Sequence, residues 1–129
     1  MTTQLWHDDC QDLDLFVDAD KSGKVQSVRI GEANTGKYDE CEYARNFKPW
    51  WVTGKHLRLR APASRVLDVY GKPNSRSPST KDGQQLELLY YAFDWAGPDV
   101  PQVMEVLCTP EKDGKPGRVV EIMLAAPSL

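Results

Sequence analysis

Apolar and polar residues alternate with a period of two near the start of the chain. Leu13, Leu15 and Val17 fall on one face of an extended strand, residues 18–24 are rich in Asp, Ser and Gly, and residues 25–30 return with three apolar positions. This pattern predicts a β-hairpin over residues 11–31.

A helical pattern follows in the middle of the chain. Val66, Val69 and Tyr70 are spaced as one helical stripe, Pro62 suits the first helical position, and Gly71 suits the residue after the last one. We expect a helix over residues 62–70, which is too short to be stable alone and must pack on a sheet. Residues 74–83, rich in Ser, Pro and Gly, are expected to form a surface loop.

Three further strands are predicted in the C-terminal half, over residues 86–93, 103–109 and 119–125. They carry apolar residues on both faces, whereas a sheet that is buried on one face should alternate more strictly. The second face is therefore expected to be partly covered, or to be available to a partner.

The two predicted hairpins also resemble each other in sequence. Residues 15–24 (LFVDADKSGK) run parallel to residues 106–115 (VLCTPEKDGK), and the apolar positions that follow match once residues 116–118 are treated as an insertion. The matched apolar pairs are Val25 with Val119, Val28 with Ile122, and Ile30 with Leu124. A duplicated unit is one interpretation, and chance similarity between two hairpins is the other.

Composition and length complete the predicted architecture. The chain has 129 residues, of which 40% are hydrophobic and 27% charged, as expected for one folded domain over residues 1–129. We predict an α+β fold in which one short helix packs on an antiparallel sheet of four to five strands. Residues 11–31 would be the strand half of a first repeat, and residues 54–126 a helix with three strands.

The charge balance narrows the classes of partner. The net charge of −3 argues against nucleic-acid binding, and no apolar run is long enough to span a membrane. Six aspartates precede the first basic residue, whereas segment 43–67 is basic and contains no acid. The two segments either neutralise each other or leave a basic patch for a partner. The oligomeric state is left open.

The state of the three cysteines depends on whether the protein works in an oxidising or a reducing compartment. Cys10 and Cys41 flank the first hairpin, so a disulfide between them would join its open ends, whereas Cys108 lies in an apolar strand and is expected to be a buried thiol. Either Cys10 and Cys41 are paired or all three thiols are reduced. No spacing among them suits zinc.

Aromatic residues are the candidate binding side chains. Trp50 and Trp51 are adjacent, so in an extended segment they point to opposite sides, and which of them is exposed stays open. Tyr91, Phe93 and Trp95 alternate along one strand and therefore share a face. This stripe is either core or an exposed protein-binding surface.

Catalytic and metal chemistry finds little support in the sequence. Asp18, Asp20 and Ser22 have the opening spacing of a calcium loop, but the position that needs a bidentate glutamate is Arg29, so a simple turn explains them better. No nucleophile motif is present. We therefore predict no enzyme activity, no metal site and no cofactor.

The segment from residue 54 onward resembles a known family. The residues concerned are Val66, Leu67, Tyr70 and Gly71 of the short helix and its end, then Pro73, Tyr90 in a strand and Gly114 in a turn. This order of elements resembles the small outer-membrane lipoproteins and the β-lactamase-inhibitor-protein-like domains. The family's usual Gly-bearing lead-in is replaced here by residues 59–62, and no lipidation cysteine follows a leader. The resemblance covers about half of the chain.

This resemblance implies a domain of the cell envelope, periplasmic or extracellular, that binds other proteins through its sheet without catalysis. Our leading hypothesis is therefore a non-enzymatic protein-binding module acting through the aromatic sheet face. The alternatives are an immunity or inhibitor protein that neutralises a toxin or an enzyme, and a small carbohydrate-binding domain that uses Trp50 and Trp51.

Overall fold

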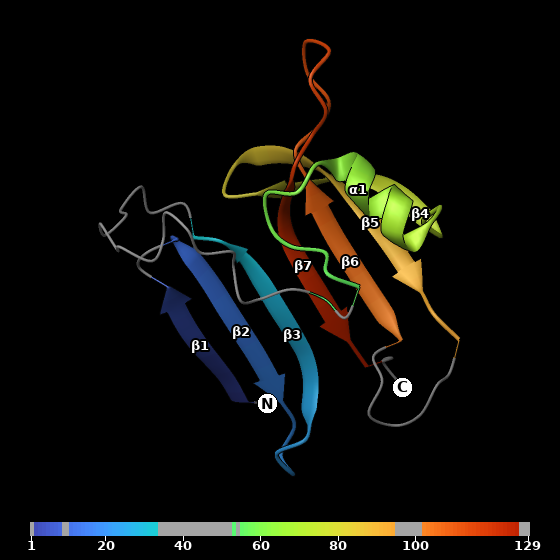
Figure 1. The fold of residues 1–129 in the computed structure, drawn as a ribbon. Helices are drawn as coiled ribbons and strands as arrows, with labels where there is room; N and C mark the ends of the chain where they lie inside the picture. The colour runs from blue at the N-terminus through green and yellow to red at the C-terminus, as the bar shows by residue number, and fades with distance from the viewer. Residues whose placement is uncertain (1, 9–10, 34–52, 54, 95–101, 127–129) are drawn as a thin grey trace.

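The computed structural model describes residues 2–8, 11–33, 53, 55–94 and 102–126. They form one antiparallel sheet of seven strands with one short helix, α1, against one face (Figure 1). The order across the sheet is β1-β2-β3-β7-β6-β5-β4. The elements are β1 (Thr2–Asp8), β2 (Leu13–Ala19), β3 (Val25–Glu32), α1 (Ala63–Tyr70), β4 (Ser75–Lys81), β5 (Gln84–Ala92), β6 (Val103–Cys108) and β7 (Val119–Ala125).

The predicted fold class is therefore wrong. The protein is mostly β, with seven strands in a single sheet, and does not have the four to five strands of the expected α+β fold. The two missed strands, β1 and β4, are the outermost ones, and most of their residues are exposed. An edge strand is stabilised from one side only and needs little burial, so its sequence lacks the apolar pattern that marks a central strand.

The remaining elements agree with the sequence pattern. The first hairpin is β2–β3, and the three C-terminal strands are β5, β6 and β7. The helix α1 begins at Ala63, buries Val66 completely and ends where Gly71 adopts a φ of 79° and donates its N–H to the carbonyl of Leu67. Within the part of the chain described, no helix is both long and apolar enough to cross a membrane.

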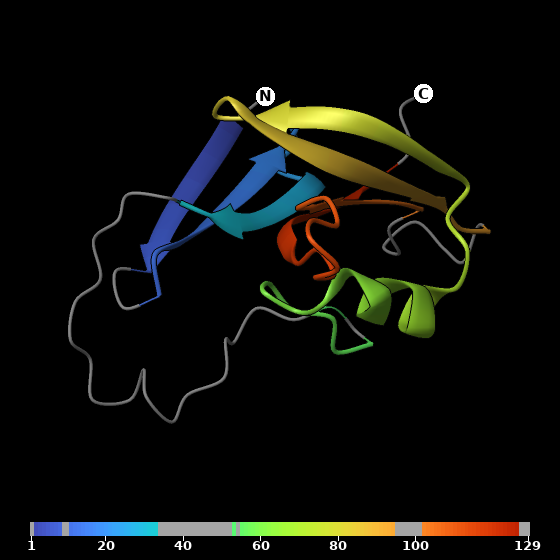
Figure 2. The same cartoon turned by 90° about the horizontal axis from the view of Figure 1, so that it is seen from above.

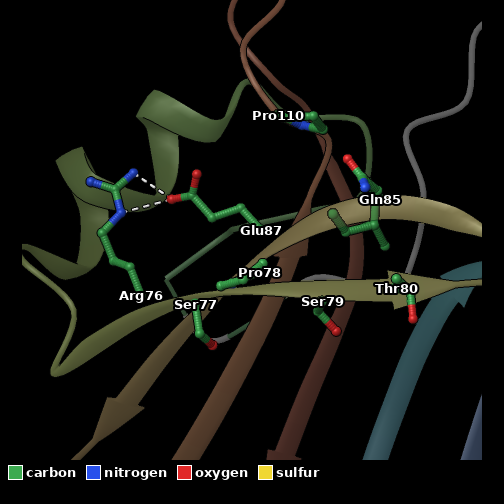
Figure 3. A pocket seen from close by; sticks show the side chains of 9 residues that line it. Arg76, Ser77, Pro78, Ser79, Thr80, Gln85, Glu87 and Pro110 are labelled. Carbon is green, nitrogen blue, oxygen red and sulfur yellow. Dashed lines mark hydrogen bonds and ion pairs between the residues drawn. The ribbon is translucent and has the colours of Figure 1, made fainter.

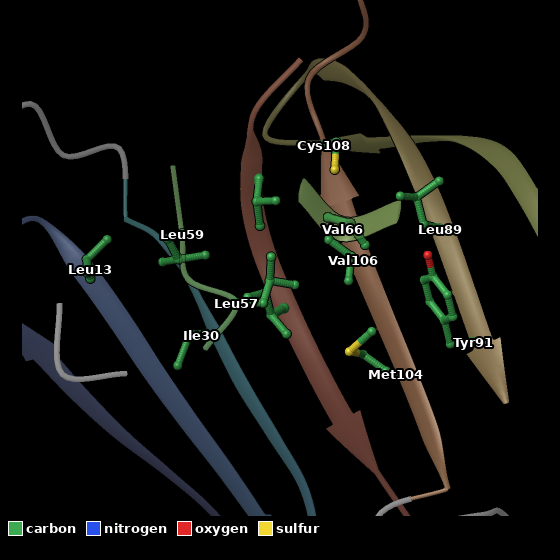
Figure 4. Close-up of a cluster of buried hydrophobic side chains, with 12 residues drawn as sticks. Leu13, Ile30, Leu57, Leu59, Val66, Leu89, Tyr91, Met104, Val106 and Cys108 are labelled. Carbon is green, nitrogen blue, oxygen red and sulfur yellow. The ribbon is translucent and has the colours of Figure 1, made fainter. Parts of the chain in front are cut away.

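The hydrophobic core lies on one face of the sheet, which we call the helix-side face. Figure 4 shows Val66 of α1 above side chains from β5 and β6, while Leu57 and Leu59 of the preceding segment cover the middle of the sheet. That segment is held along β7, since Arg60 N–H bonds to the Val119 carbonyl and Val119 N–H bonds to the Ala61 carbonyl. The helix alone would cover only part of the sheet, and segment 57–61 extends the cover.

The opposite face, which we call the far face, is partly covered by the sheet itself. Figure 2 shows the β4–β5 hairpin arching across the back of the sheet. The Lys81 ammonium at its end reaches the carbonyl of Glu32 on β3 at 3.2 Å and the carboxylate of Glu121 on β7 at 3.2 Å. Leu86 and Val120 are buried although neither belongs to the main core cluster. This coiling accounts for apolar residues on both faces of the C-terminal strands.

The two halves of the sheet meet with a local two-fold relation. In the pairing of β3 with β7, Val28 lies opposite Leu124 and Ile30 lies opposite Ile122. The sequence match equates Val28 with Ile122 and Ile30 with Leu124. Val28 therefore lies opposite the counterpart of Ile30, and Ile30 lies opposite the counterpart of Val28. Any antiparallel pairing of two matched strands gives this relation, so it fits a duplicated unit and a chance similarity equally.

The relation extends one strand further out on each side. Phe16 of β2 and Leu107 of β6 are matched positions, and they pair with Leu5 of β1 and Leu88 of β5 respectively. Residues 4–7 (QLWH) of β1 therefore occupy the places of residues 87–90 (ELLY) of β5. The outer neighbour of β5 is β4, whereas β1 pairs with β2 alone among the described residues.

Candidate protein-binding edge

The predicted aromatic stripe divides between core and surface. Tyr91 is 2% exposed on the helix-side face, and its hydroxyl donates a hydrogen bond to the Gly71 carbonyl at 2.8 Å. Phe93 is 37% exposed. The other predicted site residues, Trp50, Trp51, Trp95, Cys10 and Cys41, lie outside the described residues.

Tyr91 and Phe93 form a small aromatic cluster with Tyr70. Their ring centroids lie 5.9 to 6.2 Å apart. The Tyr70 hydroxyl donates to Thr53 Oγ1 at 2.6 Å, and the Lys55 ammonium lies 5.4 Å from the centre of the Tyr70 ring. These contacts join the end of α1 to β5 and to segment 53–55, so the buried part of this cluster holds the fold together.

The edge at β4 carries features that oppose further strand pairing. Pro78 lacks an N–H group and Arg76 adds an exposed positive charge, two devices that natural sheets use at free edges, whereas Lys81 reaches over the far face to Glu121. Figure 3 shows Arg76 paired with Glu87. The pair belongs to the lining of a groove of about 800 Å³. The groove lining combines four hydroxyl and amide side chains with Pro78, Leu86, Pro110 and the ion pair of Arg76 with Glu87.

The edge at β1 has none of these features. Its sequence, TTQLWHD, contains neither proline nor lysine, and its backbone is paired along one side only in the described structure. Leu5 is 57% exposed on the far face and Trp6 is 47% exposed on the helix-side face. Large apolar side chains on both faces of an open edge strand are a recognised liability for pairing with another chain.

Acidic residues of β2 lie beside this edge on the far face. Asp18 accepts hydrogen bonds from the hydroxyls of Thr3 at 2.6 Å and Ser27 at 2.8 Å. These bonds, together with the charge of Arg29, lower the pKa of Asp18. The carboxylate of Asp14 lies 2.7 Å from Nδ1 of His7. Asp18 is therefore ionised at neutral pH and below, next to the exposed strand.

Asp20 stabilises the turn between β2 and β3 through hydrogen bonds to its carboxylate. Its carboxylate accepts bonds from the backbone N–H groups of Ser22 and Lys24, from the Ser22 hydroxyl and from the Gln26 side-chain amide. These bonds, above all the one from the Ser22 hydroxyl, lower the pKa of Asp20. Both carboxylate oxygens are thus used within the turn, which explains the calcium-like spacing in the sequence.

Part of the basic segment is neutralised by a buried glutamate. The Glu32 carboxylate lies 3.3 Å from the Arg118 guanidinium and 3.8 Å from Nε of Arg60. Arg60 also donates to the Gln11 carbonyl at 2.6 Å. These contacts join the two halves of the sheet and assign Arg60 and Arg118 a structural role.

Comparisons with known proteins leave the family open. No family model matches the chain, and no curated protein matches it. A cysteine-rich secretory protein from Staphylococcus aureus of known structure is similar at 11% identity and a TM-score of 0.41. The match covers 96% of this chain and 34% of that protein, so the chain spans about a third of its length. A likeness this distant carries no argument about function.

Sequence reasoning missed Leu5 and Trp6. The reason is that residues 1–9 contain no apolar alternation longer than a few positions. The signal that could have found them is the match of residues 4–7 with residues 87–90, which becomes clear only through the pairing register.

Proposed function

We propose that this chain is a non-catalytic protein-binding module that takes up an extended segment of a partner protein as an additional strand beside β1. The observation that carries the proposal is the edge strand itself, which exposes Leu5 and Trp6 on its two faces. Alternate residues of an antiparallel edge strand direct their N–H and C=O groups outward, so β1 offers a row of backbone donors and acceptors. Main-chain pairing then supplies affinity and the side chains supply specificity.

The internal two-fold relation supports this assignment. In the C-terminal half, β5 is flanked by β4, and every residue of Ser75–Lys81 has a partner on β5. In the N-terminal half, β1 takes the place of β5, and the position that corresponds to β4 has no occupant in the described structure. A partner strand at β1 would complete the pattern that the second half already contains.

The contrast between the two edges supports it as well. The β4 edge carries Pro78 and the exposed Arg76, whereas β1 carries Leu5 and Trp6. Tryptophan is enriched among the residues that contribute most to protein interfaces. If both edges served only to end the sheet, both would be expected to carry protective residues.

The experiment is a selection of extended peptides of about ten residues from a display library on the immobilised protein. Selected peptides should lose most of their affinity for Leu5→Ala and Trp6→Ala, because a truncated interface anchor commonly costs about 2 kcal/mol of binding. Val25→Ala is the matched control, since Val25 is 49% exposed but lies on an inner strand. Equal losses in all three variants, or a loss on Phe93→Ala instead, would overturn the proposal.

Location in the cell envelope is part of the same proposal. It rests on the resemblance to outer-membrane lipoproteins and inhibitor-like domains described above. Mass spectrometry of the protein isolated from its native source decides the matter, because a Cys10–Cys41 disulfide excludes a reducing compartment. Fully reduced Cys10 and Cys41 would favour the alternative of a cytoplasmic immunity protein.

A further inference from the structure

We infer that the partner segment bound at β1 alternates basic and apolar residues, with the basic side chains on the far face. The inference rests on the proposed function and names the chemistry of the occupant. It follows from the different character of the two faces at this edge. Successive residues of a strand point to opposite faces, so each face selects every second residue of the incoming segment.

The far face beside β1 carries two acids, Asp14 and Asp18, and one base, Arg29, whose guanidinium lies over the Phe16 ring at 4.2 Å. Asp14 and Asp18 flank Phe16 on β2, and Thr3, Leu5 and His7 lie in front of them on β1. A strand added outside β1 lies about 4.8 Å from it, and the two aspartates lie one further strand spacing away. The long side chains of lysine and arginine can cross that spacing with their apolar stems on Leu5 and their charges near the carboxylates.

The helix-side face of the same edge is apolar. Trp6 of β1 pairs with Leu15 of β2, and Val17 follows on the same face. An apolar residue of the incoming strand would lie directly beside the exposed Trp6 ring and would remove part of it from water. The preferred segment is therefore basic at one set of alternate positions and apolar at the other.

A second copy of this chain suits the edge less well. Its β1 strand, TTQLWHD, contains neither lysine nor arginine, so it would bring no such side chain to the two aspartates of the far face. At the equivalent place in the C-terminal half, β4 contains no acid and carries Lys81 on the far face, where the ammonium lies 3.2 Å from the Glu121 carboxylate. The antiparallel pairing of β4 with β5 also predicts an antiparallel partner.

Isothermal titration with three synthetic peptides of the same length as β1 tests the inference. The peptides alternate lysine with valine, serine with valine, and glutamate with valine. We expect the lysine peptide to bind about tenfold more tightly than the serine peptide, because two solvent-exposed ion pairs together contribute about 1.4 kcal/mol of binding free energy. The glutamate peptide should bind most weakly. Raising the salt concentration should weaken the lysine peptide alone.

A double variant and its control localise the effect. Asp14→Asn with Asp18→Asn should reduce affinity for the lysine peptide to that of the serine peptide, whereas Asp68→Asn, an exposed acid of α1, should change nothing. If the double variant is unfolded by circular dichroism, the salt dependence of the parent protein decides instead. Equal affinity for the three peptides refutes the basic partner and leaves strand addition standing. If none of the peptides binds, both the basic partner and strand addition are refuted. A concentration-dependent dimer in sedimentation refutes the basic partner in favour of a second copy of this chain.

Discussion

The ammonium of Lys81 lies 3.2 Å from the carboxylate of Glu121, although β4 and β7 are separated by two strands in the sheet. In a flat sheet these strands would be about 14 Å apart. The contact therefore requires the β4–β5 hairpin to curl over the far face, as Figure 2 shows. Gly31 permits the approach, since a Cβ there would lie 2.8 Å from Lys81 Nζ.

The first prediction concerns this contact. A double-mutant cycle with Lys81→Met and Glu121→Gln should give a coupling of about 1 kcal/mol in the free energy of unfolding, because both side chains are largely buried. The exposed pair of Arg76 and Glu87 is the control, and its coupling should be smaller. Urea unfolding of the two cycles measures both values. A Lys81–Glu121 coupling no larger than that of the control would mean that the contact does not hold the hairpin.

The second prediction separates the two described aromatics of the predicted stripe. Tyr91→Ala should destabilise the fold by about 3–5 kcal/mol, because it empties a buried site beneath α1. Phe93→Ala should cost about 1 kcal/mol or less, because the ring is partly exposed. Thermal unfolding of the two variants checks the ranking. Similar large losses in both would place Phe93 in the core with Tyr91.

The third prediction concerns the buried thiol. Burial, and after it the negative charge of Glu87, raise the pKa of Cys108 from 9.0 to about 12. The folded chain therefore keeps this proton while the unfolded chain loses it above about pH 9. Below pH 9 the thiol does not affect the free energy of unfolding. Between about pH 9 and 12 it lowers the free energy of unfolding by about 1.4 kcal/mol per pH unit.

Comparison with Cys108→Ala isolates that effect from other groups that titrate at high pH. The parent protein should lose stability more steeply than the variant above pH 9, and identical slopes would refute the raised pKa. Iodoacetamide labelling followed by peptide mapping gives a second readout. Native Cys108 should react slowly at neutral pH, because only the thiolate is a nucleophile and the side chain is 2% exposed.

The helix and the five inner strands were predictable from the sequence because their patterns are local. Pro62 and Gly71 mark the ends of α1, and the apolar positions of β2, β3, β5, β6 and β7 reflect burial on at least one face. The edge strands were not predictable in this way. β4 has the composition of a loop, and only its complete pairing with β5 makes it a strand.

The candidate site was predictable only in part. Alternation correctly places Tyr91 and Phe93 on one face, but it does not say that α1 and Gly71 cover the first and leave the second partly exposed. The burial of Leu86, itself part of the β4–β5 hairpin, accompanies the coiling of that hairpin over the far face, and the contact of Lys81 with Glu121 in this arrangement joins residues distant in sequence. Exposure at an edge, as for Leu5 and Trp6, depends on which strand is outermost, and the order of strands is a property of the whole sheet.

Amide hydrogen exchange of β1 is the most direct test of the central claim that this strand is an unfilled pairing site. With the lysine–valine peptide bound, alternate amides of Thr2–Asp8 should exchange more slowly, while the amides of Ser75–Lys81 at the opposite edge should keep their rates. Alternation is expected because only every second N–H of an edge strand points outward. Protection confined to the region of Phe93, or equal at the two edges, would contradict the account.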